Sequence, residues 1–287
     1  MLHVAVTGAG GFIGKKLMGY TGKEFSFFPL DARTLMAGGA PDPSFTPDHV
    51  IHLAAKTFVP DSWKNPGEFY RVNVMGTQAV LDYCRKHQCG MTYVSSYVYG
   101  VPQYLPVNEA HPVAPNTPYN HSKLMGEELC EFYHRYYDLD MAVLRPFNIY
   151  GPGQDMSFLI PTIVNQVLHE EKIELQNLDP KRDYLYIDDF MDALIATVKF
   201  KGFGKFNLGS GNSVSVKEVA GELLRISGQQ HKEIMSSGII RENEVMDVVA
   251  DTNKFKAQFG WSQKIGMAEG LENMLNAGRE IQKMTKH

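Results

Sequence analysis

The sequence predicts an α/β protein in which a doubly wound parallel sheet, with helices on both faces, is followed by a smaller C-terminal α/β lobe. Short apolar runs alternate with longer helical patterns through the first half of the chain. A glycine-rich turn follows the first apolar run, and the alternation becomes less regular after Tyr150. Strand–helix–strand repeats form right-handed crossovers and therefore a parallel sheet.

Each element is predicted from its apolar pattern. Short apolar runs predict strands, and longer stretches with an apolar face predict helices. The predicted strands are Leu2–Val6, Phe25–Phe28, His49–Ala54, Met91–Ser95, Met141–Arg145 and Phe206–Leu208. The predicted helices are Phe12–Tyr20, Gly67–His87, Tyr119–Tyr137, Phe158–His169, Asp188–Phe200, Val216–Ser227 and Met267–Ala277.

The segment after the second strand is too short for a complete sheet of this type. Seventeen residues, Ala32 to Asp48, precede the third strand, and they include Gly38, Gly39 and three prolines. A complete sheet needs a helix, a strand and another helix here, and each crossover takes about ten residues or more. We therefore expect the edge strand after residue 31 to be missing or reduced to a stub.

The composition narrows the classes of function. With 28 basic and 32 acidic residues the chain has a net charge of −4, which disfavours nucleic-acid binding. No run of about 18 apolar residues occurs, so a membrane span is not expected. The N-terminus shows no export signal, and the three cysteines contain no C-x-x-C pair. These features predict a cytoplasmic protein with reduced thiols.

Metal chemistry is not predicted. His49, His52 and His121 do not form a helical H-x-x-x-H pair, and no acidic cluster joins them. Histidines that are hydrogen-bonded in the core or exposed at the surface are the simpler interpretation.

The first motif with chemical meaning is Thr7-Gly-Ala-Gly-Gly-Phe-Ile-Gly14, which follows an apolar strand and opens a helix. Gly8, Gly11 and Gly14 give a G-x-x-G-x-x-G spacing. Glycine lets the backbone turn tightly and approach a pyrophosphate, which then lies on the amide groups of the helix N-terminus. The motif favours a dinucleotide site, and a tight turn in an ordinary α/β protein is the alternative.

Asp31 lies at the end of the second strand, seventeen residues after Gly14. A carboxylate there accepts hydrogen bonds from an adenosine ribose, which favours NAD and repels the 2′-phosphate of NADP. Arg33 could instead pair with that phosphate. An Asp that contacts adenine, or that only starts a turn, is also open. NAD is the expected cofactor, with NADP as the alternative.

A second motif combines Tyr119 and Lys123, which share one face of a predicted helix. A free tyrosine has a pKa of about 10, which is too high for proton transfer at neutral pH. A neighbouring ammonium group and a positive nicotinamide ring would lower that pKa. Ser95 lies at the C-terminal end of a predicted strand, where such sheets bind ligands, and can hydrogen-bond the reacting oxygen.

These motifs, taken in order with several others, resemble the extended short-chain dehydrogenase/reductase superfamily. More narrowly, the chain is similar to the NAD-dependent epimerase/dehydratase family, which acts on nucleotide-sugars. The resemblance covers nearly the whole chain, and the joint order and spacing of the motifs are highly specific. The further motifs are His52-Leu-Ala-Ala55, Asn73-Val-Met-Gly-Thr77, Val98-Tyr-Gly100, Leu144-Arg-Pro-Phe-Asn-Ile-Tyr-Gly-Pro-Gly-Gln154, Arg182-Asp-Tyr-Leu-Tyr-Ile-Asp-Asp189, Phe206-Asn-Leu-Gly-Ser210 and Phe259-Gly-Trp261.

The resemblance implies a role for each matched position. Ser95, Tyr119 and Lys123 match the family's catalytic Ser/Thr, Tyr and Lys; counting back from Val98-Tyr-Gly100 selects Ser95 rather than Ser96. The implied cofactor-binding residues are Gly8, Gly11, Phe12, Ile13, Gly14, Asp31, Arg33, Leu53, Ala54, Ala55, Lys56, Asn73, Tyr119 and Lys123. The implied substrate-binding residues are Ser95, Ser96, Tyr97, Asn148, Arg182 and Arg241. The last two arginines would hold the diphosphate, and no metal is implied.

The resemblance also implies two domains. Residues 1–150, completed by about 188–210, would form a dinucleotide-binding domain of the Rossmann type. Residues 151–287 would form the lobe that binds the nucleotide-sugar.

The two residues after Ser95 bear on the reaction. Family 4,6-dehydratases place an acid, and often a Glu, directly after the catalytic Ser or Thr, whereas this chain has Ser96 and Tyr97. Neither replaces a carboxylic acid at neutral pH, which disfavours dehydration. Reduction of a 4-keto sugar and epimerisation at C4 need only hydride transfer and the Ser/Tyr/Lys group, so both stay open.

Two features favour reduction. The shortened segment after Asp31 is similar to that of compact 4-ketoreductases, and Arg241-Glu-Asn-Glu-Val-Met246 is similar to deoxysugar synthases that reduce C4. The stretches 95–100 and 182–189 are equally similar to epimerases, so a 4-epimerase that retains NAD is the alternative. A non-catalytic dinucleotide sensor is a further one, although such relatives typically lack the Tyr or the Lys.

Two expectations concern surfaces. Aromatic residues gather on the helix of Tyr119, and in this superfamily that helix and the Gly67–His87 helix commonly pair with their copies, so a homodimer is expected. These aromatic residues are Phe132, Tyr133, Tyr136 and Tyr137. Substrate choice is expected to depend on the pocket built by Tyr97, Met156–Ile160 and Gly238–Arg241.

Overall fold

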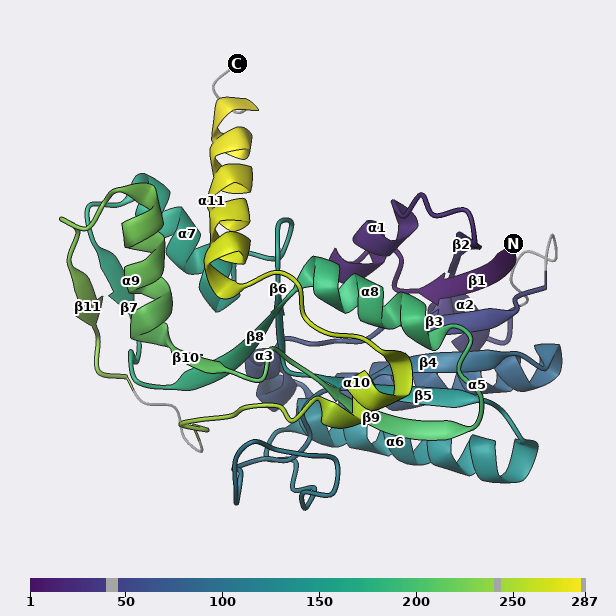
Figure 1. The fold of residues 1–287 in the computed structure, drawn as a ribbon. Coiled ribbons are helices and arrows are strands. Elements are labelled where there is room, and N and C mark those ends of the chain that lie inside the picture. The colour runs from purple at the N-terminus through teal and green to yellow at the C-terminus, as the bar shows by residue number, and fades with distance from the viewer. Residues whose placement is uncertain (40–45, 240–243, 285–287) are drawn as a thin grey trace.

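Six parallel strands form the central sheet of the computed structural model, which describes residues 1–39, 46–239 and 244–284 (Figure 1). Each neighbouring pair in the sheet runs parallel. The residues of β3 and β5 are buried throughout, as expected of strands covered on both faces. In spatial order the strands are β2 (Phe25–Leu30), β1 (Leu2–Thr7), β3 (His49–His52), β4 (Gly90–Val94), β5 (Met141–Pro146) and β9 (Phe203–Leu208).

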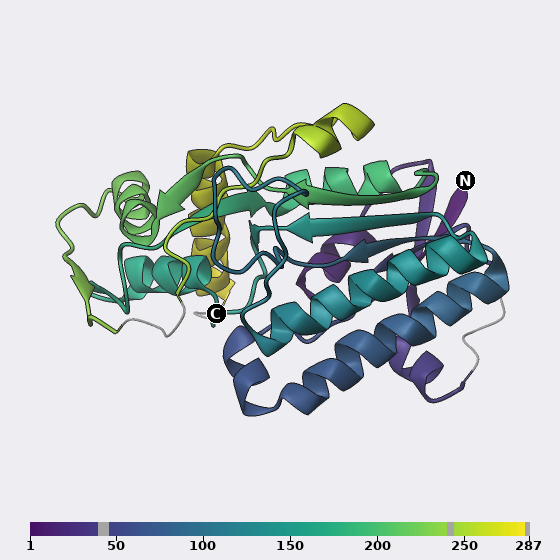
Figure 2. The ribbon, with the colours of Figure 1, turned by 90° about the horizontal axis from the view of Figure 1, so that it is seen from below.

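Helices cover both faces of this sheet, which confirms the predicted doubly wound class. α1 (Phe12–Met18) packs beside α8 (Ile187–Thr197) on one face. On the other face α5 (Gly76–His87) and α6 (Pro118–Tyr137) lie side by side (Figure 2). Two buried apolar clusters follow from this layering, and the three free cysteines all lie in the one beneath α5 and α6.

The edge of the sheet ends at β2 among the described residues, which confirms the expected loss of the strand after residue 31. A five-residue helix, α2 (Ala32–Met36), follows β2 directly and packs on α5. The sequence prediction did not include this helix. The prolines Pro41 and Pro43 of the short segment lie outside the described residues.

The predicted helix Gly67–His87 is interrupted. It consists of α4 (Pro66–Tyr70), a π-helical segment η1 (Arg71–Met75) and α5. A further short helix, α3 (Val59–Lys64), precedes α4. Extra residues per turn of this kind often occur at functional sites, and η1 contains Asn73.

A smaller lobe lies beyond the carboxyl ends of the strands (Figure 2). Its two sheets have the orders β10-β8-β6 and β11-β7. Ser215 and Glu218 cap α9 reciprocally, which explains where that helix begins. The strands are β6 (Asn148–Tyr150), β7 (Ile173–Leu175), β8 (Lys181–Tyr186), β10 (Ser213–Ser215) and β11 (Ile234–Ser236). The helices of the lobe are α7 (Leu159–His169), α9 (Val216–Ser227) and α11 (Met267–Met284), whereas α10 (Asn253–Phe259) packs on β9 of the central sheet.

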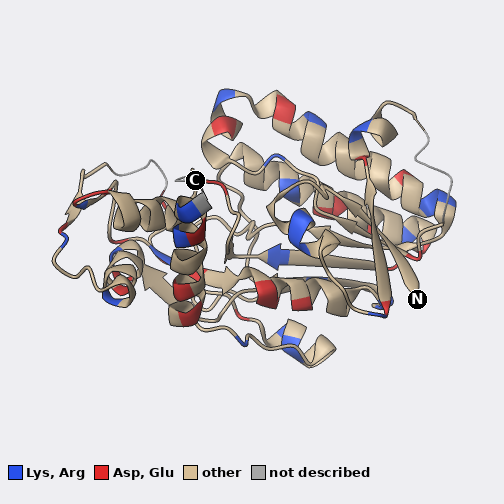
Figure 3. Cartoon of the chain, turned by 90° about the horizontal axis from the view of Figure 1, so that it is seen from above, with Lys and Arg blue, Asp and Glu red and all other residues tan. Residues whose placement is uncertain are grey.

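Acidic and basic residues are interspersed over the helices and loops, while most strand residues carry no charge (Figure 3). This mixture agrees with the small net charge of −4. Among the described residues, no helix combines the length and apolar character that a membrane crossing requires.

Candidate active site

The glycine-rich turn between β1 and α1 is held in one tight conformation. Gly8 has a φ of +70°, a region that favours glycine, and its carbonyl oxygen accepts a hydrogen bond of 2.9 Å from the Gly11 amide. A Cβ on Gly14 would lie 2.2 Å from the Gly8 carbonyl oxygen, and one on Gly8 would lie 2.8 Å from the Ala54 nitrogen. The turn therefore tolerates only glycine at both positions, as a pyrophosphate cradle requires.

Thr7, the last residue of β1, fastens this turn to the backbone that follows β3. Its hydroxyl oxygen accepts hydrogen bonds from the amides of Leu53 at 3.2 Å and Ala54 at 3.1 Å. Phe12 and Ile13 are half-buried and pack on the larger apolar cluster beneath the turn. The predicted cofactor residues of β1, α1 and the β3 end thus lie together, and Ala55 is half-buried beside them.

His52 extends this connection, and the sequence analysis assigned it no role. Its Nδ1 lies 2.6 Å from the Thr7 hydroxyl, and its Nε2 lies 3.0 Å from the Thr77 hydroxyl. Thr77 donates its own proton to the Asn73 carbonyl oxygen at 2.6 Å, so His52 must donate from Nε2 and accept from Thr7 at Nδ1. Burial lowers the pKa of His52 to about 3, which keeps the ring neutral.

Asn73 joins the predicted cofactor segment to α6. Its side chain accepts from the Lys56 amide at 2.8 Å and donates to the Lys56 carbonyl at 3.0 Å. The same amide nitrogen donates to the Ser122 hydroxyl at 2.9 Å, and Ser122 donates to the Tyr119 carbonyl at 2.7 Å. The Lys56 ammonium pairs with Glu68 at 2.7 Å. The π-helical position of Asn73 therefore fixes two predicted site residues at once.

Asp31 and Arg33 lie apart from this network, at the start of α2. Asp31 caps that helix by accepting from the Arg33 amide at 3.0 Å, and Thr34 donates to its other oxygen at 3.2 Å. The backbone bond from Arg33 lowers the pKa of Asp31. The Arg33 side chain is 91% exposed, and its Nε donates to Asp31 Oδ1 at 3.5 Å. The capping role explains the Asp locally and leaves a ribose contact as a proposal.

Tyr119 and Lys123 lie one turn apart on α6, which begins where Thr117 accepts from the Asn120 amide. Burial raises the pKa of Tyr119 well above its usual value, and a hydrogen bond with Ser96 acts in the opposite direction. Burial also lowers the pKa of Lys123 to about 7. In the protein without a dinucleotide, burial therefore outweighs the Ser96 hydrogen bond, and the expected lowering of the Tyr119 pKa by Lys123 and a nicotinamide ring stays a prediction.

The two serines after β4 differ in their partners. The Ser95 hydroxyl, 3% exposed, donates to Glu127 Oε1 at 2.5 Å. The Ser96 hydroxyl lies 3.4 Å from Asn120 Oδ1 and also hydrogen-bonds Tyr119. Both serines thus meet α6, Ser95 at Glu127 and Ser96 at Asn120 and Tyr119.

A buried ion pair lies behind Ser95, and the sequence analysis did not single it out. Glu127, one turn after Lys123, accepts from Arg145 Nη2 at 2.6 Å and from Arg145 Nε at 3.0 and 3.2 Å. Arg145 Nη1 donates to the Tyr99 hydroxyl at 2.8 Å, which donates to Asn207 at 2.6 Å. These hydrogen bonds therefore join α6, β5, β9 and the segment that follows β4. Arg145 is a charged residue in an otherwise apolar strand, and this feature of the sequence could have indicated a buried ion pair.

The predicted substrate residues of the second lobe lie on β6 and β8. Asn148 donates its amide to the Asp183 carbonyl at 3.0 Å. Arg182 donates to the Val245 carbonyl at 2.5 Å, so part of its guanidinium is already engaged. Tyr97 stacks on Phe147 with ring centres 5.2 Å apart. Arg241 lies outside the described residues.

Asp183 is a second buried acid that sequence reasoning missed. Its carboxylate accepts from the Ser210 amide and hydroxyl, from the Gly211 amide and from the Ala250 amide, at 2.6 to 3.0 Å. These donors come from the loop after β9 and from the segment that follows residue 244. Asp183 therefore orients the lobe around Asn148 and Arg182.

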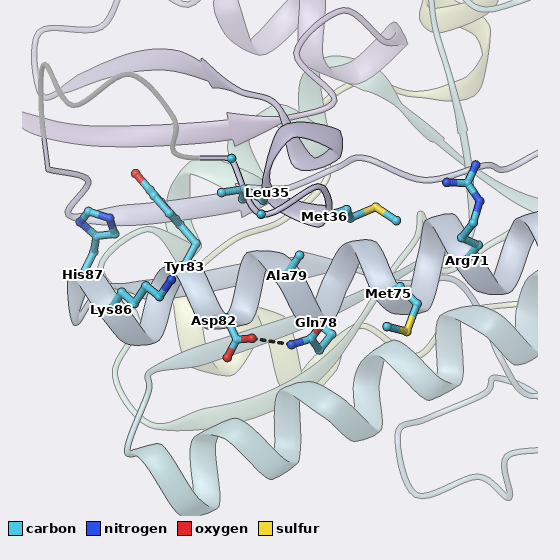
Figure 4. Close-up of a pocket in the computed structure, with 12 residues that line it drawn as sticks. Leu35, Met36, Arg71, Met75, Gln78, Ala79, Asp82, Tyr83, Lys86 and His87 are labelled. Atoms are coloured by element: carbon cyan, nitrogen blue, oxygen red, sulfur yellow. Dashed lines mark hydrogen bonds between the residues drawn. The ribbon is translucent and has the colours of Figure 1, made fainter.

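A cavity of about 570 Å³ lies elsewhere, between α2 and the helical run 71–87 (Figure 4). Met36 and Leu35 line it from α2, and Met75 and Tyr83 line it from the opposite side. It forms where the short α2 replaces a longer crossover. None of its lining residues belongs to the predicted cofactor or substrate set, so the hydrogen-bond geometry, rather than this cavity, locates the site.

The chain is similar in sequence to enzymes that act on nucleotide-sugars. The family model described as GDP-mannose 4,6 dehydratase matches residues 43–274. The GDP-6-deoxy-D-mannose reductase of Pseudomonas aeruginosa is 28% identical over 94% of this chain and 95% of its own. The UDP-glucose 4-epimerase of Halalkalibacterium halodurans is 30% identical over 78% of this chain and 73% of its own.

The fold is also similar to solved structures. The RMD protein of Pseudomonas aeruginosa, in complex with NADPH, superposes with a TM-score of 0.91 and 28% sequence identity. The match covers 98% of this chain and 100% of that one. The parallel sheet and the second lobe are therefore shared over the whole length.

Proposed function

The chain belongs to the GDP-mannose 4,6-dehydratase family, within the NAD-dependent epimerases and dehydratases of the extended short-chain dehydrogenase/reductase superfamily, and we propose that it reduces a 4-keto nucleotide-sugar at C4. Members of this class are enzymes of nucleotide-sugar chemistry, and this chain is one of them. The reductase and the NADPH complex from Pseudomonas aeruginosa, each matched over nearly the whole chain, support the specific reaction.

One observation carries the choice of reduction over dehydration. The Ser96 hydroxyl hydrogen-bonds Tyr119 and lies 3.4 Å from Asn120 Oδ1, and the neighbouring Ser95 hydroxyl donates to Glu127. The carboxylate closest to them by hydrogen bonding, Glu127, is held by Arg145 and is not free to take up a C5 proton. A site built from hydroxyls suits the protonation of a C4 oxygen during hydride transfer.

Each catalytic residue has its own role in this proposal. Tyr119 donates its phenolic proton to the C4 oxygen of the sugar, and Ser95 orients that oxygen. Lys123 holds the nicotinamide ribose and favours the phenolate that the proton transfer leaves. A bound nicotinamide dinucleotide supplies the hydride.

The cofactor we propose is NAD(P)H, held by the turn from Gly8 to Gly14, by Leu53–Lys56 and by Asn73. The fit rests on the turn itself, where a Cβ at Gly14 would meet the Gly8 carbonyl at 2.2 Å. Asp31 would contact the adenosine ribose of NADH, and Arg33 the 2′-phosphate of NADPH. Residues 1–150 with 188–210 would form the dinucleotide domain, and residues 151–287 the nucleotide-sugar lobe.

We further propose that Asn148, Arg182 and Arg241 hold the nucleotide diphosphate, with Ser96 and Tyr97 near the sugar. A homodimer through α5 and α6 is proposed from the exposed aromatic residues of α6, where Phe132 is 50% and Tyr136 is 64% exposed. Large exposed apolar side chains of this kind mark interaction surfaces.

A 4-epimerase is the second candidate, favoured by the 30% identity to the Halalkalibacterium halodurans enzyme. The two reactions differ in what happens to the dinucleotide. An epimerase returns the hydride to the sugar and keeps its NAD, whereas a reductase consumes NAD(P)H in each turnover.

Two measurements decide between them. Mass spectrometry of the small molecules released on denaturation shows whether the purified protein retains a stoichiometric dinucleotide, and which one. Absorbance at 340 nm then follows NAD(P)H oxidation with the 4-keto form of GDP-6-deoxy-D-mannose. Turnover of the ketone by a protein that releases no dinucleotide supports the reductase. Retained NAD together with interconversion of UDP-glucose and UDP-galactose would instead establish the epimerase.

A further inference from the structure

The buried carboxylate of Glu127 touches the serine that the proposed mechanism uses, although the mechanism assigns it no role. Its side chain is 0% exposed, and its Oε1 lies 2.5 Å from the Ser95 hydroxyl. Tyr119, Lys123 and Glu127 follow one another at intervals of four residues along one face of α6. The contact therefore lies on the same face of the helix as the proposed catalytic tyrosine and lysine.

The direction of this hydrogen bond follows from the partners of Glu127. Arg145 donates to both carboxylate oxygens and is itself 2% exposed. A guanidinium group remains charged in proteins, so the carboxylate that pairs with it is ionised and can only accept. The single proton of the Ser95 hydroxyl must then point at Glu127, as the geometry of the contact requires.

We propose that Glu127 is a positioning residue that sets the polarity of Ser95 toward the substrate. With its proton given to Glu127, Ser95 offers only lone pairs to the sugar. While this bond is made, Ser95 can accept a hydrogen bond from a C4 hydroxyl group, and it can donate one to a C4 carbonyl group only by releasing Glu127. The inference rests on the proposed function, in which these two groups are product and substrate of the same step.

The geometry also shows how Ser95 can change partners. If its hydroxyl rotates away, Glu127 Oε1 still accepts from Arg145 Nε at 3.0 Å, so the carboxylate keeps a donor on each oxygen. The lost bond is charge-assisted and therefore stronger than one between neutral groups. The site is consequently preorganised for the hydroxyl form, while the ketone must compete with Glu127 for the serine proton.

Glu127→Asp tests this directly, because Asp keeps the charge beside Arg145 but is one methylene too short to hold Ser95. We compare wild type, Glu127→Asp, Ser95→Ala and the double variant. For each, NADPH oxidation yields the KM of the 4-keto form of GDP-6-deoxy-D-mannose and the inhibition constant of GDP-6-deoxy-D-mannose. Glu127→Asp should raise the ratio of inhibition constant to KM by about three- to tenfold, the range of one hydrogen bond.

The same change should have no effect in the Ser95→Ala background, because Glu127 acts through that hydroxyl. Ser96→Ala serves as the matched control, and its effect should add to that of Glu127→Asp. If Glu127→Asp raised the ratio by the same factor in wild type and in the Ser95→Ala variant, the inference would be overturned. NADPH affinity, measured by fluorescence, should stay the same in all variants, whereas a general structural defect would lower it.

A double substitution tests the same inference if the Glu127→Asp variant does not fold. Glu127→Leu combined with Arg145→Met removes both charges and leaves no unpaired buried ion. Position 127 then has no acceptor for the Ser95 proton, so the ratio should again rise, and an unchanged ratio refutes the role of Glu127. A wild-type protein that transfers no hydride to the ketone would remove the proposed function itself, and the inference with it.

Discussion

The ammonium nitrogen of Lys123 lies 4.3 Å from the centre of the Tyr93 ring, in a position where the residue is only 3% exposed. The Tyr93 hydroxyl donates to the Lys123 carbonyl at 3.2 Å, and His52 stacks on the same ring. The attraction between a charged amine and an aromatic ring face partly offsets the loss of the amine's hydration. Burial nevertheless lowers the pKa of Lys123 to about 7.

The first prediction follows from this shift. The unfolded chain keeps the Lys123 proton up to its ordinary pKa of 10.5, whereas the native state releases it from about pH 7 upward. The unfolded state therefore binds more protons in this window, and the stability of the cofactor-free protein should rise with pH, by at most about 1.4 kcal/mol per unit. Denaturant unfolding from pH 7 to 9, compared with Lys123→Met, isolates the effect. A pH-independent difference between the two proteins would contradict it.

Replacing Tyr119 by Phe removes the proposed proton donor while keeping the ring. We expect kcat to fall by about 100-fold or more, the usual contribution of a general acid. Dinucleotide affinity, measured by fluorescence titration, should change little. Tyr136→Phe on the exposed face of α6 is the control and should keep full activity. Substantial turnover by the Tyr119 variant would show that another group protonates the sugar.

Arg33 is expected to decide between the two nicotinamide dinucleotides. Its side chain is 91% exposed, and its surface ion pair with Asp31 at 3.5 Å is weak enough to be exchanged for a 2′-phosphate. Arg33→Ala should weaken NADPH binding by about tenfold, the scale of one charge-assisted hydrogen bond, and leave NADH binding unchanged. Isothermal titration with both dinucleotides measures this, with Arg135→Ala as the control. Equal losses for NADH and NADPH would refute a phosphate contact.

The aromatic surface of α6 should hold two copies together. Phe132→Glu places a charge among Tyr136 and Tyr137 and should convert a dimer into monomers, because an interface cannot bury an unpaired carboxylate without a large cost. Sedimentation equilibrium measures the mass of both forms. Glu128→Gln, elsewhere on the same helix, is the control. A wild-type chain that sediments as a monomer at all concentrations would rule out this proposal.

The sequence pattern predicted much of the fold because it depends on local rules. Alternating apolar runs and helical patterns, together with the glycine turn, were sufficient for the parallel sheet and its order of elements. The seventeen residues of 32–48 were too few for another crossover, and the described sheet ends at β2. Local rules did not predict the interruption at η1, because the π-helical turn around Asn73 is stabilised by partners on other elements, Lys56 and Ser122.

The candidate site divides in the same way. Motif spacing predicted that Tyr119, Lys123 and Ser95 lie at one end of the sheet, where the carboxyl ends of parallel strands converge. Spacing could not show that Ser95 faces Glu127 whereas Ser96 faces Tyr119. The rotamers of two adjacent serines depend on which acceptors α6 presents to them.

What the sequence by itself determined was the class of the protein: the sheet, the dinucleotide turn and the order of the motifs. These follow from periodicity and from glycines that only one backbone geometry can use. Only the tertiary structure decided which buried groups touch, such as Glu127 with Arg145 and His52 with Thr7. Each of these pairs joins residues from different elements, and a buried charge or imidazole takes its protonation state from partners that the linear sequence does not place beside it.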